Sequence, residues 1–213
     1  MVLLNRLGLG LALGLALLAG GCATATLPES PTPDWCPTPP PLAMDAQGLI
    51  LLPNVVRQLT PDPESSWAYA LRGSLARPAL LAGHGAATAQ ALAQLEYLAN
   101  GLTHSMRFIS SPALAQPRLQ LGRRALREWL GIAPATPDAQ VVGAFFATEC
   151  ALRANDREAA RRALAQVAQA PDALEEIAPS SGAPPAVPPA TQAAASSAVW
   201  AVQGQAGPLR LGF

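Results

Sequence analysis

The sequence contains no lysine and is poor in histidine, tyrosine and net charge. It has 213 residues with two histidines and two tyrosines, and its 14 arginines balance 14 acidic residues. Without lysine the chain has neither the amine for a Schiff base nor the lysine of a phosphate-binding loop. Without a net positive charge it has no field that would recruit nucleic acid. We therefore predict no nucleic-acid partner.

Motifs for metals, cofactors and catalysis are also missing. Neither His84 nor His104 has a Cys, His or carboxylate three or four residues away, the spacing that places two ligands on one helix face. Gly83-His84-Gly85 resembles a dinucleotide loop, but Thr88 stands where the third glycine would be. There is no Gly-x-Ser-x-Gly elbow. We expect no metal, no cofactor and no catalytic residue.

The first 21 residues have the parts of an export signal. Arg6 supplies a positive start, the stretch from Leu7 to Ala19 contains only Leu, Gly and Ala, and small residues then precede Cys22. The pattern Leu18-Ala19-Gly20-Gly21-Cys22 resembles the lipobox of bacterial lipoproteins, with Ala19 where leucine is preferred. The resemblance implies cleavage after residue 21 and a lipid anchor on Cys22. An uncleaved membrane helix is the alternative, because no charge occurs between Leu7 and Pro28.

The same resemblance implies a location. Ala23, rather than Asp, follows the modified cysteine and is similar to the sorting pattern for the outer membrane. We expect a protein that is anchored through its lipid on the periplasmic face of the outer membrane, with inner-membrane anchoring as the alternative.

A proline-rich stalk is predicted for residues 22–45. Its prolines exclude helix and favour extended polyproline II. An alternative role is a ligand for a groove that binds prolines. The prolines are Pro28, Pro31, Pro33, Pro37, Pro39, Pro40 and Pro41.

Residues 46–170 are predicted to form an all-α domain, because apolar residues recur at helical spacing. We expect about four helices, at 85–109, 117–130, 138–153 and 156–169, as a small bundle or stacked hairpins. The helix at 138–153 is apolar on more than one face and is expected to be the most buried.

Four local signals mark the ends of these helices. Gly131 can terminate the second helix, and Thr136-Pro137-Asp138 can start the third. Asn155-Asp156 can break the third helix and cap the fourth. The tight turn followed by Ala160 and Leu164 resembles a single tetratricopeptide-type hairpin at about 137–171, which would imply a weak peptide-binding role.

Residues 171–213 are rich in alanine and proline and are predicted to be a disordered tail. The closing Leu209, Leu211 and Phe213 alternate in a way that resembles the last strand of outer-membrane barrels, but no upstream segment supplies further strands. A segment that binds a partner is the preferred interpretation of this end.

Cys36 and Cys150 remain as thiols once Cys22 is assigned to lipid. The periplasm is oxidising, so a disulfide between them is one alternative. The other is that Cys150 is simply a buried apolar residue.

Two further hypotheses concern charge. Arginines outnumber acids between residues 118 and 162, so Arg123, Arg127, Arg157 and Arg161 are candidates for a basic surface, with an ordinary solvated face as the alternative.

Glu149 lies on the most apolar helix and has Arg153 four residues later, which suggests either a raised pKa or an ion pair.

From these features we expect a noncatalytic adaptor or scaffold: a helical module, anchored by lipid, that binds another envelope protein. A carrier of a small molecule or lipid is the alternative, and a large apolar cavity would favour it. A cell-wall enzyme is the third hypothesis, and it would need clustered ionisable groups.

Overall fold

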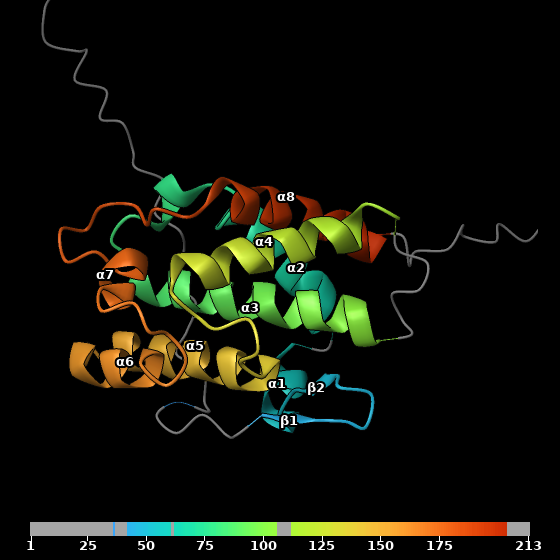
Figure 1. The fold of residues 1–213 in the computed structure, drawn as a ribbon, viewed down its shortest axis with the longest axis horizontal. Helices are drawn as coiled ribbons and strands as arrows, with labels where there is room; N and C mark the ends of the chain where they lie inside the picture. The colour runs from blue at the N-terminus through green and yellow to red at the C-terminus, as the bar shows by residue number, and fades with distance from the viewer. Residues whose placement is uncertain (1–35, 37–41, 61, 106–111, 204–213) are drawn as a thin grey trace, which may run out of the picture.

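The computed structural model describes residues 36, 42–60, 62–105 and 112–203 (Figure 1). The predicted signal sequence and Cys22 lie outside these residues, as do most of the stalk and the segment 204–213. In the described ranges, no helix combines the length and the apolar character needed to cross a membrane.

The described fold is mostly helical. A short antiparallel hairpin, β1 (Ala43–Met44) and β2 (Ile50–Leu51), pairs Ala43 with Leu51 and is followed by α1 (Asn54–Leu59). The remaining elements are α2 (Pro63–Gly73), the 3-10 turn η1 (Pro78–Leu81), α3 (Gly85–His104), α4 (Ala115–Trp129), α5 (Asp138–Arg153), α6 (Arg157–Leu164), α7 (Ala173–Ile177) and α8 (Pro189–Gln203). The expectation of about four helices is wrong, because α1, α2, α7 and α8 form in segments to which we assigned no helix.

Helix α3 lies at the centre of the fold. It packs against α2, α4, α5 and α8 (Figure 1), and every residue from Ala91 to Leu102 is buried. The expectation that 138–153 would be the most buried helix is therefore wrong. The polar residues Gln94 and Asn100 are buried as well, because α3 has neighbours on several sides.

The helices end and begin at the residues that the local signals predicted. Gly131 has a positive φ of 67° directly after α4, where a residue without Cβ is favoured. Asn155 has φ 57°, and the Asp156 side chain accepts a hydrogen bond of 2.8 Å from Ala159 N at the start of α6. Helix α5 begins at Asp138 and ends at Arg153, as predicted, whereas α6 ends at Leu164 rather than near residue 169.

The prediction of a disordered tail is wrong for α7 and α8. Helix α8 packs along α4 and α2 (Figure 1). Thr191 Oγ1 on α8 donates a hydrogen bond of 2.9 Å to Gly122 O on α4. A Cβ atom at Gly122 would overlap that of Ala194 and lie 3.0 Å from Ala190 O. The alanines that suggested disorder are the small residues that permit this close approach, so the helical fold extends to Gln203.

Candidate functional site

A disulfide joins Cys36 to Cys150 on α5. Their Cα atoms are 5.5 Å apart, and 114 positions separate them in the sequence. Of the two alternatives for the cysteines, the structure contains the covalent one. The bond fixes Cys36, which lies within the predicted stalk of residues 22–45, against the last turns of α5.

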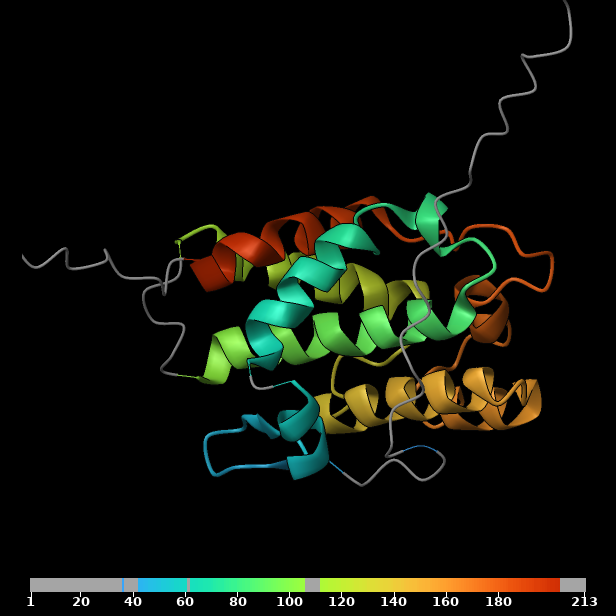
Figure 2. The ribbon, with the colours of Figure 1, turned by 180° about the vertical axis from the view of Figure 1, so that it is seen from behind.

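A groove of about 1060 Å³ lies one helical turn from this disulfide. Its walls come from α2, the first half of α3, the end of α5, the start of α6 and the residues directly after α7. Figure 2 shows the side of the fold on which α2 crosses in front of α3. Arg153, three residues after Cys150, is one of its walls. The polar lining residues are Thr60, Ser66, Ser74, His84, Gln90, Gln94, Arg153, Asn155 and Arg157.

The groove is rich in hydrogen-bond donors. Among the residues that line it there is no Asp or Glu. Gln94 is only 5% exposed, and within the described part of the chain no protein group hydrogen-bonds the side-chain amide of Gln94 or of Gln90. Both side chains line the groove, so their amides can hydrogen-bond to a ligand there.

Glu149 directly precedes Cys150 on α5, and Arg153 is a residue of the groove lining. Arg153 Nε and Nη2 each donate to Glu149 Oε1 at 3.0 Å, which forms the predicted ion pair. The other oxygen, Glu149 Oε2, is buried and has no hydrogen-bond partner among the residues that the structure describes. Burial raises the pKa of Glu149 to about 7, although the charge and hydrogen bond of Arg153 act in the opposite direction.

Arg157 forms the outer edge of the groove. Its Nη2 donates to Glu175 Oε1 at 2.5 Å and to Ala178 O at 2.9 Å, which ties the start of α6 to the end of α7. The pKa of Glu175 is lowered, first by the hydrogen bond from Ser180 N and then by the Ser180 hydroxyl and Arg157. These contacts hold the guanidinium of Arg157 in place at the groove.

The predicted basic surface is wrong. Arg127 is 4% exposed, and it donates from Nε to Glu96 Oε1 and from Nη2 to Glu96 Oε2, both at 2.9 Å. Arg123 Nε donates to Glu96 Oε2 at 2.8 Å, and both arginines also bind Asp138. The charge count over residues 118–162 missed Glu96, which comes from α3.

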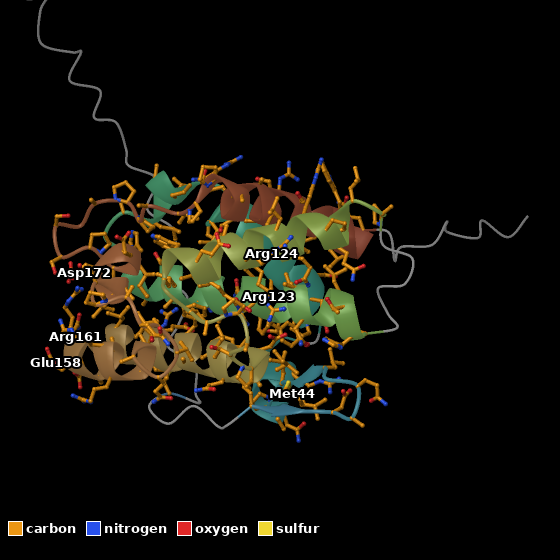
Figure 3. All side chains as sticks on the ribbon, in the orientation of Figure 1. Met44, Arg123, Arg124, Glu158, Arg161 and Asp172 are labelled. Atoms are coloured by element: carbon orange, nitrogen blue, oxygen red, sulfur yellow. A yellow bond between two sulfur atoms is a disulfide. The ribbon has the colours of Figure 1, made fainter. Side chains whose placement is uncertain are left out.

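The other two arginines of that hypothesis lie on a different part of the molecule and are paired. Arg161 binds Glu158 on the exposed face of α6, and Arg157 binds Glu175. Figure 3 shows Arg161 beside Glu158 at one end of the molecule and Arg123 within the layer of helices. The structure therefore does not bring the four arginines together.

Asn100 completes the buried charged cluster formed by Glu96, Asp138, Arg123 and Arg127. Its Nδ2 donates to Asp138 Oδ2 at 2.9 Å and to Gly48 O at 3.0 Å, and its Oδ1 accepts from Ile50 N at 3.0 Å. The cluster thereby joins α3, α4, α5 and the β hairpin. In the sequence, Glu96 is a lone carboxylate within an apolar stretch, and this is the pattern that indicates a buried charged cluster.

The histidines occupy separate places. His84 lines the groove, whereas the ring of His104 lies beneath Gly48. In the ranges that the structure covers, no three His, Cys, Asp or Glu side chains gather in a way that would hold a metal ion.

No protein-family model matches this chain, and no curated protein or solved structure matches it either. The function is therefore argued from the groove and its residues.

Proposed function

We propose that this chain is a noncatalytic adaptor of the bacterial envelope, anchored by lipid at Cys22 to the periplasmic face of the outer membrane. It binds an extended segment of another envelope protein in the groove between α2, α3 and α5. The observation that carries this proposal is the groove itself: its walls offer donors, include no carboxylate and hold two glutamine amides that no described protein group hydrogen-bonds.

An extended peptide segment suits such walls. Its backbone carbonyls point outward and need donors, which side-chain amides, hydroxyls and guanidinium groups supply. Arg153 and Arg157 are the charged residues of the lining, and because they are paired with Glu149 and Glu175, the amides and hydroxyls are the main donors for such a segment.

The disulfide supports the location. Stable disulfides are typical of oxidising compartments such as the periplasm and are rare in the cytosol. The bond between Cys36 and Cys150 therefore agrees with the export implied by the lipobox resemblance.

The alternative of a small-molecule carrier uses the same groove. Its volume of about 1060 Å³ is slightly above the usual range for small-ligand sites, so it is large enough for such a ligand. A carrier for lipid would need mainly apolar walls, whereas here Trp67, Leu81 and Leu152 are the large apolar side chains of the lining. An anionic small molecule fits the lining better than a lipid tail.

Photocrosslinking in intact cells tests the adaptor proposal. A benzophenone amino acid replaces Ser66 in the groove or, as the matched control, Gln116 on the exposed face of α4. We expect one envelope protein to be crosslinked from position 66 and not from 116, and the product to disappear with Gln90→Leu. Equal crosslinking from both positions, or none from position 66, would contradict the proposal.

A further inference from the structure

Helix α8 forms one edge of the molecule, with α4 on one side of it and α2 on the other (Figures 1 and 2). Exposed side chains of these three helices, with the residue just before α4, together form the α8 face. We propose that the α8 face contacts a lipid bilayer whose headgroups carry negative charge. Neither the groove nor the lipid anchor is needed for this contact. The α8 face consists of Tyr69, Arg72, Leu114, Arg118, Leu121, Arg124, Trp200 and Gln203.

Large apolar side chains are exposed on the α8 face. In the described ranges, the only others of this class are Met44 and Leu51 in the β hairpin. Folded proteins rarely gather such side chains on one surface without a binding role. The four on the α8 face, each exposed by half or more, are Tyr69, Leu114, Leu121 and Trp200.

Contacts between the helices join these side chains into one surface. The Arg118 guanidinium lies over the Trp200 ring, with 5.5 Å between its Cζ and the ring centroid. Gln203 follows Trp200 by three residues and donates from Nε2 to Tyr69 Oη at 3.3 Å. The two leucines are three or four residues from Arg118, so they share its side of α4.

The charged groups of the α8 face are all arginines. Arg72, Arg118 and Arg124 are exposed, and none of them forms an ion pair with a described residue. Helix α8 carries no charged residue, and Glu128, one turn beyond Arg124, is the one acidic residue of α4. Guanidinium groups pair with phosphate oxygens in a two-pronged geometry, so the charge of this face is complementary to anionic phospholipid headgroups.

The aromatic residues favour a membrane over a protein as the partner. Trp and Tyr are amphipathic and lie by preference at the boundary between headgroups and acyl chains. A bilayer accepts half-exposed rings without matching their shape, whereas a protein partner must supply pockets for them. Because Tyr69 and the groove residue Ser66 both lie on α2, this contact places the groove beside the bilayer.

Binding to vesicles tests the proposal with a chain that has no lipid of its own. The predicted mature chain, from residue 22 and with Cys22→Ser, is mixed with vesicles of phosphatidylcholine, either alone or with an equal part of phosphatidylglycerol. Sedimentation measures the partition coefficient. The test variant is Arg118→Gln with Arg124→Gln. The matched control is Arg57→Gln with Arg162→Gln, which removes two exposed arginines from α1 and α6.

We expect the chain to bind the vesicles that contain phosphatidylglycerol. The test variant should bind about thirtyfold more weakly, because each cation near an anionic surface contributes about fivefold. The control should lose less than about threefold, because its arginines lie away from the surface and are screened by salt. Bromine on the acyl chains quenches a tryptophan that inserts among them, so Trp200→Phe should lower the quenching.

Three results would overturn the proposal: no binding to the anionic vesicles, equal losses in the two arginine variants, or quenching that Trp200→Phe leaves unchanged. If vesicles do not bind while a benzophenone at Ser196, exposed on α8, captures a protein in intact cells, the α8 face is a protein interface instead. The function of the groove is tested separately, by crosslinking from position 66.

Discussion

The carboxylates at the two ends of the interface between α3 and α5 differ in how completely they are hydrogen-bonded. At one end Glu96 and Asp138 accept hydrogen bonds from Arg123, Arg127 and Asn100, and both oxygens of each carboxylate have partners. At the other end Glu149 has one oxygen bound by Arg153 and one without a partner. The first end holds the fold together, whereas the second adjoins the groove and the disulfide.

We propose that the fully hydrogen-bonded cluster serves the architecture and that the incomplete pair at Glu149 belongs to a functional region. A buried ion pair is tolerated when its hydrogen bonds are complete, and removing one partner costs several kcal/mol. An incomplete pair destabilises the native state and is kept when it serves another purpose. We therefore place the function of this protein at the Glu149 end.

Removal of the disulfide is expected to have the largest effect. Replacing Cys36 and Cys150 by alanine opens a loop of 114 positions, and the chain-entropy estimate gives a loss of about 4 to 5 kcal/mol in the free energy of unfolding. Hydrogen exchange should show that amides near Cys150 lose protection before those near Asp138. Equal loss at the two ends would contradict the distinction between them.

Loss of the Glu96 carboxylate is expected to cost about 3 to 5 kcal/mol, because Glu96→Gln leaves two buried guanidinium groups with Asp138 as their remaining carboxylate. Urea unfolding at pH 7 measures this change. Glu158→Gln is the control, since it breaks an exposed pair with Arg161, and it should change the free energy of unfolding by less than about 0.5 kcal/mol. Similar values for the two variants would show that the charged cluster is unimportant for stability.

Glu149→Gln is expected to stabilise the protein at high pH by about 3 kcal/mol. The pKa of Glu149 is raised from 4.5 to about 7 in the folded state, so the native state binds more protons between these values. The free energy of unfolding therefore falls as the pH rises from about 4.5 to about 7. Glutamine has no charge, so the Glu149→Gln variant does not show this decrease. Unfolding at pH 5 and pH 8 should show a benefit at pH 8 that nearly vanishes at pH 5, and exposed Glu128→Gln should show neither change.

Two glycine substitutions are expected to have smaller effects. Gly122→Ala places a methyl group against Ala194 and should destabilise the packing of α4 on α8 by about 1 to 3 kcal/mol. Gly143→Ala, in α5, has no atom within 4 Å of the added carbon and should stabilise by up to about 1 kcal/mol. Thermal unfolding distinguishes the two signs, and a neutral Gly122→Ala would argue against a docked α8.

Local signals predicted much of the helical core. Asp138, Asn155 and Asp156 act through the backbone around them, so their effects can be read without knowing the fold. The docking of α8 could not be predicted in this way. An alanine-rich helix has little apolar surface of its own, and its stability depends on the shape of α4 at Gly122.

The candidate site was predicted only in part. The spacing of Glu149 and Arg153 predicted their pairing, and the cysteine count left the disulfide open. The groove depends on contacts between residues distant in sequence, such as Ser66, Gln90 and Arg157. The arginines were misassigned because a charge count along the chain does not show that Glu96 lies across from Arg123 and Arg127.

The most direct test measures the free energies of unfolding of Glu96→Gln and Glu149→Gln side by side at pH 8. The account predicts opposite signs: Glu96→Gln destabilises the protein and Glu149→Gln stabilises it. If both variants destabilise the protein, then Glu96 and Glu149 both stabilise the native state. In that case Glu149 no longer supports a functional site beside the groove.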